Sequence, residues 1–198
     1  MILNRLEFLM IASPIRAFIQ AHVDGPRLRS MGGDVPCGRV LEIGCGTGKG
    51  AEIILDQFKA AHVDAIDEDE RMVRRARKRL RGRPVQVEVG DATRLKAADE
   101  TYDAVFDFGV IHHIPNWRLT VAEAFRVLKP GGRFFAEEIL RGFILHPVMR
   151  RLFKHPSHDR FDHQEFLRGL SAVGFNVVAS KHYHNVLGFY VARKDSPD

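Results

Sequence analysis

Residues 40–50 read VLEIGCGTGKG, and this stretch decides the fold. Its apolar beginning, with Arg39 before it, is typical of a short buried strand over 39–43, and a helix pattern follows over 50–58. Glycines at the end of a strand allow positive φ angles and let a ligand approach the backbone closely. The N-terminus of the following helix offers unsatisfied N–H groups. The stretch therefore predicts a strand, a ligand-binding turn and a helix.

Strand and helix patterns continue to alternate along the chain, which favours right-handed crossovers and a parallel sheet covered on both faces. Near the end, two strands follow each other with a connection too short for a parallel crossover, so they form an antiparallel pair. We expect an α/β, Rossmann-like sheet of seven strands, mostly parallel, with an antiparallel C-terminal hairpin and helices on both faces. The expected strands are 39–43, 62–66, 84–89, 103–108, 133–138, 175–180 and 186–193, and the expected helices are 50–58, 68–81, 117–128 and 163–172.

Composition fits an ordinary globular domain. The chain has 198 residues, of which 45% are hydrophobic and 28% charged, so disorder, collagen-like repeats and a coiled coil are excluded. Two cysteines, Cys37 and Cys45, are too few for a disulfide scaffold and indicate a reducing compartment. The net charge of +5 permits an anionic partner without requiring one.

The first residues do not fit a signal peptide. Charged residues and a proline interrupt their apolar character: Arg5, Glu7, Pro14 and Arg16. Apolar residues recur there at helical spacing, which predicts an amphipathic helix: Leu3, Leu6, Leu9 and Met10. Since no apolar run is long enough for a transmembrane helix, we expect a cytoplasmic protein.

Two cofactor classes compete for the glycine turn. Gly46, Gly48 and Ala51 satisfy the G-x-G-x-x-A pattern of dinucleotide sites. Asp67, at the end of the second strand, has the spacing of a carboxylate that binds ribose hydroxyls. Both nicotinamide cofactors and S-adenosylmethionine contain such a ribose, so Asp67 does not discriminate between a nicotinamide-dependent oxidoreductase and a methyltransferase.

Six blocks in register resemble the class I S-adenosylmethionine-dependent methyltransferases (methyltransferase type 11). They are most similar to the small-molecule and lipid branch that includes ubiquinone and menaquinone biosynthesis methyltransferases. The resemblance covers roughly residues 38–193. The blocks are E-x-G-x-G-x-G over 42–48, Asp67 followed by Met72, VGDA over 89–92, YDAV over 102–105, VIHHI over 110–114 and RVLKPGG over 126–132.

The resemblance implies S-adenosylmethionine as cofactor and assigns roles around it. The glycines wrap the amino-acid tail, Glu42 orients the turn, Asp67 accepts from the ribose, and Asp91 with Ala92 meets the adenine. Glu68 departs from the family, which commonly has an apolar residue there. The cofactor-binding residues so implied are Glu42, Gly44, Cys45, Gly46, Gly48, Asp67, Glu68, Met72, Asp91, Ala92 and Phe108.

Methyl transfer from a sulfonium is an in-line displacement, and a general base is needed only when the acceptor must lose a proton. His113, after the fourth strand, is a candidate base or acceptor contact, although one of this histidine pair can instead cap or pack under the next helix. Glu137 and Glu138 are neighbours on the fifth strand and point to opposite faces, so one can face the pocket. The candidate catalytic residues are His113 and Glu138, and the candidate substrate-binding residues are His112, Glu137 and Arg141.

The chain divides by expected role into four parts of one methyltransferase domain. These are an N-terminal helical substrate cap over 1–38, a cofactor-binding core over 39–138, a substrate lid over 139–163, and a C-terminal helix and hairpin over 164–198. The lid interleaves large apolar residues with Arg and Lys, which suits a small-molecule or lipid-like acceptor and peripheral membrane contact. Ordinary core packing of two short helices is the alternative for the lid. A non-catalytic binding protein of the same fold also stays open.

Two other patterns are not interpreted as sites. The cluster His155, His158, Asp159, Asp162 and His163 lacks familiar metal spacing. Asp162 with Glu165 instead predicts a capping box for the helix at 163. The arginine-rich helix over 71–81 is typical of a solvated face, so we do not expect a nucleic-acid partner.

Overall fold

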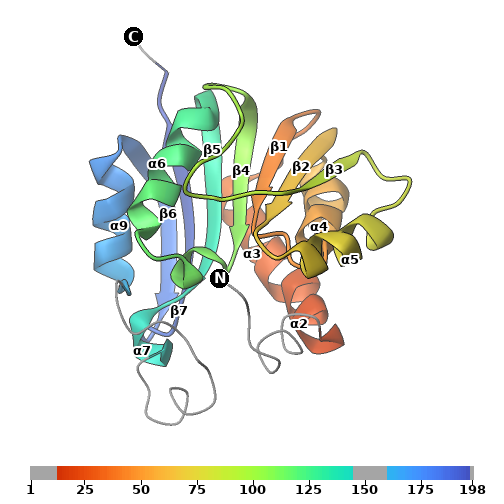
Figure 1. The fold of residues 1–198 in the computed structure, drawn as a ribbon. Helices are drawn as coiled ribbons and strands as arrows, with labels where there is room; N and C mark the ends of the chain where they lie inside the picture. Colours follow the sequence, from red (N-terminus) through yellow and green to blue (C-terminus); the bar gives the residue numbers. More distant parts are fainter. Residues whose placement is uncertain (1–12, 145–159, 197–198) are drawn as a thin grey trace.

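A computed structural model describes residues 13–144 and 160–196 of the chain. Within them, seven strands form one sheet in the order β3-β2-β1-β4-β5-β7-β6 (Figure 1). The strands are β1 (Arg39–Ile43), β2 (His62–Asp67), β3 (Val85–Val89), β4 (Tyr102–Phe108), β5 (Leu128–Ile139), β6 (Phe175–Tyr183) and β7 (Leu187–Lys194).

The pairings confirm the sheet that the sequence predicts. Strands β1 to β5 pair in parallel, and β7 pairs antiparallel with both β5 and β6. The order of the parallel strands reverses between β1 and β4. In open α/β sheets, ligands bind outside the carboxyl ends of the strands at such a switch point.

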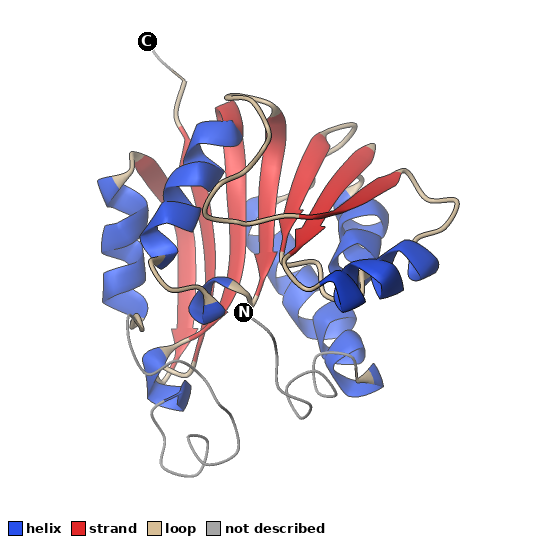
Figure 2. Cartoon of the chain, viewed as in Figure 1, coloured by secondary structure: helices blue, strands red, loops and turns tan. Residues whose placement is uncertain are grey.

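Helices cover both faces of the sheet (Figure 2). One face packs against α3 (Gly25–Gly32), α4 (Lys49–Phe58) and α5 (Glu70–Arg79), and the other against α6 (Trp117–Val127) and α9 (His163–Ala172). At the carboxyl edge lie the short elements α2 (Pro14–Ile19), the π-helix η1 (Gln20–Asp24), the 3₁₀-helix η2 (Ile111–His113) and α7 (Arg141–Ile144).

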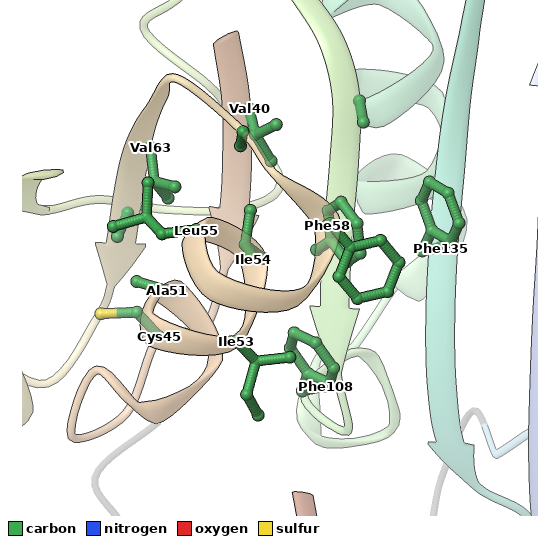
Figure 3. Packing of buried hydrophobic residues seen from close by; sticks show 14 of the residues in the cluster. Val40, Cys45, Ala51, Ile53, Ile54, Leu55, Phe58, Val63, Phe108 and Phe135 are labelled. Carbon is green, nitrogen blue, oxygen red and sulfur yellow. The ribbon is translucent and has the colours of Figure 1, made fainter. Parts of the chain in front are cut away.

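The core beneath α4 holds the glycine turn and the end of β4 in place. Figure 3 shows Ile54 and Phe58 of α4 packed toward the sheet, where Phe58 meets Phe135 with ring centroids 5.4 Å apart. Phe106 of β4 contacts both rings: its centroid lies 4.7 Å from that of Phe58 and 4.4 Å from that of Phe135, on which it stacks. Each such fully buried side chain contributes roughly 1.5–3 kcal/mol. The strand ends that face the ligand therefore rest on a rigid base.

Three elements differ from the sequence expectation by two or more residues at an end, and one of them, β6, runs to Tyr183 rather than to 180. β5 begins at Leu128 rather than at 133, because Leu128 pairs with Tyr102 before a register shift carries the strand through Gly131. α5 begins at Glu70 rather than at 68, because the Asp69 side chain caps it by accepting from the Arg71 N–H. The predicted helix over Leu3, Leu6, Leu9 and Met10 lies outside the described residues.

The capping box predicted for α9 is confirmed. Asp162 accepts from the backbone N–H of Glu165, and the Glu165 side chain accepts in return from that of Asp162. His155, His158 and Asp159 lie outside the described residues, within which no group of three or more ligating side chains can hold a metal ion. Over the same residues, no helix has the length and apolar character needed to cross a membrane.

Candidate active site

The glycine turn between β1 and α4 needs its glycines for geometric reasons. Gly44, Gly46 and Gly48 have φ angles of 67°, 52° and 85°, which side-chain-bearing residues rarely adopt. A Cβ on Gly44 would also lie 2.4 Å from Cγ2 of Val110, in the segment that follows β4. The turn therefore brings the backbone at the ends of β1 and β4 into close contact.

Glu42 lies behind this turn and is buried. Its carboxyl accepts from the backbone N–H of Ala51, and burial, with Asp67 and Asp107 nearby, raises its pKa well above the ordinary value. Gly50 makes room for it, since a Cβ there would lie 1.8 Å from Glu42 Oε1. Glu42 thus supports the turn from beneath.

Asp67 ends β2 and is fixed by two backbone donors. Its Oδ2 accepts from the N–H of Gly46 and its Oδ1 from the N–H of Asp69, each at 2.8 Å. Burial is the main cause that raises its pKa, and the two N–H groups oppose that rise. Each oxygen keeps a further lone pair, so the carboxylate can accept from a ligand's hydroxyls.

The residues after β2 and β3 form the next wall. Met72 is buried on α5, whereas Glu68 is exposed at the rim. Asp91 Oδ1 accepts from both the N–H and the hydroxyl of Thr93, at 2.8 and 2.7 Å, which holds Asp91 and Ala92 in a tight turn.

These walls enclose a cavity of about 490 Å³ at the switch point, within the usual range for ligand sites. The ionisable residues that line it include four carboxylates and two cations, Asp67, Glu68, Asp69, Asp91, Arg16 and Lys49, together with His113. Of the predicted cofactor-binding residues, eight line the cavity besides Asp67: Gly44, Cys45, Gly46, Glu68, Met72, Asp91, Ala92 and Phe108. Glu42 and Gly48 lie behind that lining.

The segment after β4 forms the wall opposite Asp91. Phe108, Val110 and His113 line the cavity, and His113 is partly exposed. His112 is buried instead, and its ring contacts that of His113 at a tilt of 39°, with centroids 4.1 Å apart. Of the two histidines, His113 is the one that a ligand in the cavity can touch.

Glu138 anchors this segment from β5. It is fully buried, and its carboxyl accepts from the N–H of Ile111 at 2.7 Å, the N–H of His112 at 3.1 Å and Nδ1 of His112 at 2.6 Å. A hydrogen bond also joins it to Asp107, which is fully buried on β4. Burial raises the pKa of Glu138 to about 7 and that of Asp107 well above its ordinary value, so the pair holds a proton.

Glu137, on the other face of β5, binds Arg16 from α2. The Arg16 Nη2 donates to Glu137 Oε2 at 2.6 Å and to the carbonyl of Phe108 at 3.3 Å, while Nη1 pairs with Asp24. Burial and the Glu137 charge raise the pKa of Asp24 to about 6, against the effect of Arg16. Arg16 and Gln20 line the cavity, and sequence reasoning missed both because no local pattern links them to β5.

Arg141 does not line this cavity among the described residues. It donates instead to the carbonyl of Arg160 and to the side chain of Glu165. It thereby ties the start of α7 to the start of α9. Most of the predicted lid, residues 145–159, lies outside the described part of the chain.

Comparison with protein families matches residues 41–136 to a methyltransferase domain. A ubiquinone/menaquinone biosynthesis C-methyltransferase of Desulfotalea psychrophila is 36% identical over 51% of this chain and 41% of its own. A phthiotriol/phenolphthiotriol dimycocerosates methyltransferase of Mycobacterium tuberculosis is 34% identical over 48% of this chain and 36% of its own. The chain thus spans about two fifths of the length of these relatives.

Solved structures match more of the chain. A putative methyltransferase in complex with the Trm112 methyltransferase activator of Haloferax volcanii matches with a TM-score of 0.80 and 16% identity, over 98% of this chain and 100% of the other. An S-adenosylmethionine-dependent methyltransferase of Mesorhizobium loti matches with a TM-score of 0.73 and 18% identity, over 85% and 96%. These matches give no support to a nicotinamide-dependent oxidoreductase. Residues 41–136 therefore match a methyltransferase domain, and the chain has the fold of these solved methyltransferase structures.

Proposed function

We propose that this protein transfers the methyl group of S-adenosylmethionine to a small-molecule or lipid-like acceptor. One observation carries the proposal: the glycine turn, Asp67 and Asp91 line the same cavity as Phe108 and His113. A cofactor on the first set of residues therefore has its reactive end within reach of an acceptor on the second. The names of relatives add support, since they include methyltransferases of quinones and a fatty-acid O-methyltransferase.

The residues present fit this cofactor. The turn at Gly44 and Gly46 exposes backbone for an amino-acid tail, and Asp67 has lone pairs left for ribose hydroxyls. Asp91 and Met72 offer an acceptor and an apolar surface for adenine. The carboxylates of the lining outnumber its cations, which suits a ligand that carries a sulfonium and an ammonium group.

When bound, S-adenosylmethionine supplies both an activated methyl group and its own leaving group. The protein holds the acceptor in line with the methyl carbon, at about 3–3.5 Å. Phe108, Val110 and Ile114 give this part of the cavity apolar walls that limit water. His113 contacts the acceptor, and it takes a proton where the acceptor is a phenol or another hydroxyl.

Positioning falls to residues that do not line the cavity. Glu138 and His112 hold the η2 turn, so that the His113 ring faces the ligand. Glu137 holds Arg16 and thereby the N-terminal cap. We further propose that Arg141 holds the start of α7 against the start of α9, and that the protein works in the reducing cytoplasm at a membrane surface. The free thiols of Cys37 and Cys45 support that compartment.

Ligand binding tests the cofactor assignment. We expect S-adenosylhomocysteine, and not NAD, to raise the melting temperature of the protein. Asp67→Ala should weaken binding of S-adenosylhomocysteine at least 10-fold, because a half-buried acceptor of two hydroxyls is lost. Asp56→Ala is the matched control, since Asp56 is exposed and pairs only with Arg83 among the contacts described. Stabilisation by NAD alone, or unchanged affinity of Asp67→Ala, would overturn the assignment.

A transfer assay tests the acceptor side. Radiolabelled S-adenosylmethionine is incubated with the protein and either a bacterial lipid extract or a set of small phenols and quinols. His113→Ala should lower the rate of label transfer to a phenolic or hydroxyl acceptor by 10²-fold or more, with little change in affinity for S-adenosylhomocysteine. Label transfer by His113→Ala at the wild-type rate would remove His113 from the mechanism.

A further inference from the structure

The N-terminal helical segment exposes a stripe of large apolar side chains. Ile15, Phe18, Ile19 and Val23 are 73%, 63%, 41% and 45% exposed, and together we call them the docking face. Their spacing of three, four and eight residues from Ile15 puts them on one side of the continuous helical stretch formed by α2 and η1. Contiguous exposed apolar residues of this kind mark a surface that another apolar body covers.

The opposite side of the same stretch is polar and faces inward. Arg16 and Gln20 line the active-site cavity, and Asp24 is 1% exposed. An ordinary surface helix of a soluble protein has the reverse arrangement, with apolar residues inward and polar residues in water. Arg16 fixes the orientation through its bonds to Asp24 and Glu137, so a simple rotation of the helix cannot bury the docking face.

The charge around the docking face is positive. Residues 13–33 contain one acidic residue, Asp24, which is buried, and the exposed Arg29 pairs with Asp34 just beyond them. The surface continues onto the turn between β6 and β7, because Arg27 of α3 donates to the hydroxyl of Tyr183 at the end of β6. The hairpin over 175–194 contains no acidic residue and presents exposed cationic or titratable side chains at this turn: Lys181, His182 and His184.

This turn lies at the same edge of the molecule as the docking face. Since β7 runs antiparallel to both β5 and β6, β6 runs parallel to β1–β5, and its end at Tyr183 lies at the carboxyl edge of the sheet. Figure 1 shows α2 at that same edge, beyond the ends of β1 and β2. The part of this edge next to the β6–β7 turn therefore combines exposed apolar side chains with the cations of that turn.

We propose that the docking face seats the protein on a lipid bilayer that contains anionic lipids. Apolar side chains that enter the headgroup boundary and cations that meet lipid phosphates are the combination that peripheral membrane helices use. A protein partner with an acidic and apolar patch would also match these charges. Phe18 and Ile15 protrude from one side of a helix, however, and a bilayer can take up such side chains without a groove shaped to fit them. The bilayer is therefore the occupant to which we commit.

The proposal names the surface by which the protein meets the membrane. Its consequence for catalysis rests on the proposed function, namely methyl transfer to a lipid-like acceptor. Since Arg16 and Gln20 form the back of the docking face and a wall of the cavity, a docked protein holds its cavity near the bilayer surface. A lipid-like acceptor can then reach the methyl donor without crossing bulk water.

Vesicle flotation tests the docking face with the full chain. Wild-type protein is expected to float with vesicles of phosphatidylcholine and phosphatidylglycerol at 70:30, and at least 10-fold less with phosphatidylcholine alone. Ile15→Asp and Phe18→Asp should each lower binding to the anionic vesicles at least 10-fold. Leu119→Asp is the matched control, because Leu119 is 52% exposed on α6, and its binding should equal that of the wild type.

Three measurements keep the test decisive. The proposal is overturned when wild-type protein fails to float with the vesicles, or when both docking-face variants float like the wild type. It is also overturned when light scattering shows that the wild type is a dimer and that these variants are monomers. A fall of more than 5 °C in the melting temperature of both variants would show that the stripe packs within the fold, and would also overturn it. Binding of S-adenosylhomocysteine is measured in parallel, since its loss in wild-type protein would refute the proposed function while leaving vesicle docking to its own result.

Discussion

Replacing Glu138 tests whether the η2 turn, which places His113 in the cavity, is held in position by a carboxyl group that does not itself line the cavity. Three donors end on this one fully buried side chain: the N–H of Ile111, the N–H of His112 and the Nδ1 of His112. Glu138→Ala leaves all three without their acceptor. Glu138→Gln keeps the shape but turns one acceptor into a donor, so one of these hydrogen bonds must break.

The expected losses follow from that count. A buried donor left without an acceptor costs about 1–3 kcal/mol, so Glu138→Gln should lower the free energy of unfolding by about that amount. Glu138→Ala should lower it by about 3–5 kcal/mol, because three such donors lose their acceptor together. For a domain of this size, that corresponds to a fall of about 6–20 °C in melting temperature. Urea unfolding followed by circular dichroism measures both variants.

The same group makes stability depend on pH. Burial raises the pKa of Glu138 from 4.5 to about 7, so the folded state binds more protons than the unfolded state between these values. The contribution of Glu138 to stability is therefore fully present below the unfolded pKa and is lost as pH rises through the folded pKa, by an amount on the order of 3 kcal/mol. Glu138→Gln removes this titration, so the difference in unfolding free energy between wild type and Glu138→Gln should shrink between pH 5 and pH 8.

Two outcomes would refute the reasoning. One is a change below about 0.5 kcal/mol in both Glu138 variants, which is the level of an ordinary surface substitution. The other is a wild-type stability that rises relative to Glu138→Gln between pH 5 and pH 8. Glu100→Ala is the control, because Glu100 is 54% exposed and its ion pair with Lys194 contributes at most about 1 kcal/mol. The rate of methyl transfer should fall in Glu138→Gln more than the affinity for S-adenosylhomocysteine does, since Glu138 positions the acceptor side.

Two further substitutions test the supports of the cavity. Gly50→Ala should lower the free energy of unfolding by about 1–3 kcal/mol and weaken cofactor binding, because its Cβ would lie 1.8 Å from Oε1 of Glu42; wild-type stability in urea would contradict this. Arg16→Met should cost about 3–5 kcal/mol near neutral pH, because Glu137 and Asp24 are then buried without their cation; an unchanged melting temperature at pH 7 would show that the contact of Arg16 with them is not formed.

Sequence alone predicted the parts of the site that lie within one strand–turn–helix unit. The glycines at 44, 46 and 48 have the positive φ angles that their pattern indicates, and Asp67 ends β2 beside them. Such features are local, because a strand that ends in a glycine turn puts its last side chains and the helix N-terminus at one point. The parallel sheet and the antiparallel pairing of β6 with β7 followed from the alternation of elements and from the short connection before β7.

Other parts of the site depend on contacts that no local pattern records. Arg16 meets Glu137, which is 121 positions away, and Asp107 meets Glu138 across two strands. Alternation along β5 correctly put Glu137 and Glu138 on opposite faces, but their partners depend on which elements pack over each face. Only the tertiary structure shows that both carboxyls are buried, that Glu137 holds Arg16, and that Glu138 holds the η2 turn.

The carboxyl edge of the sheet gathers an unusual number of acidic side chains. Buried carboxyls lie at or near the ends of β1, β4 and β5, as Glu42, Asp107, Glu137 and Glu138, and Asp67 ends β2. Arg16 compensates Glu137, whereas burial and neighbouring acids raise the pKa of Glu42 and Asp107 well above their ordinary values.

An arrangement of this kind costs stability in the empty protein, because carboxyl groups crowd together away from water. A ligand with sulfonium and ammonium charges relieves that cost at the place where it is greatest, whereas an anionic dinucleotide would add to it. The electrostatics of the strand ends therefore favour the cationic cofactor independently of any motif. They also explain the role of carboxyl groups that do not line the cavity, such as Glu42. These groups serve cofactor binding rather than core packing.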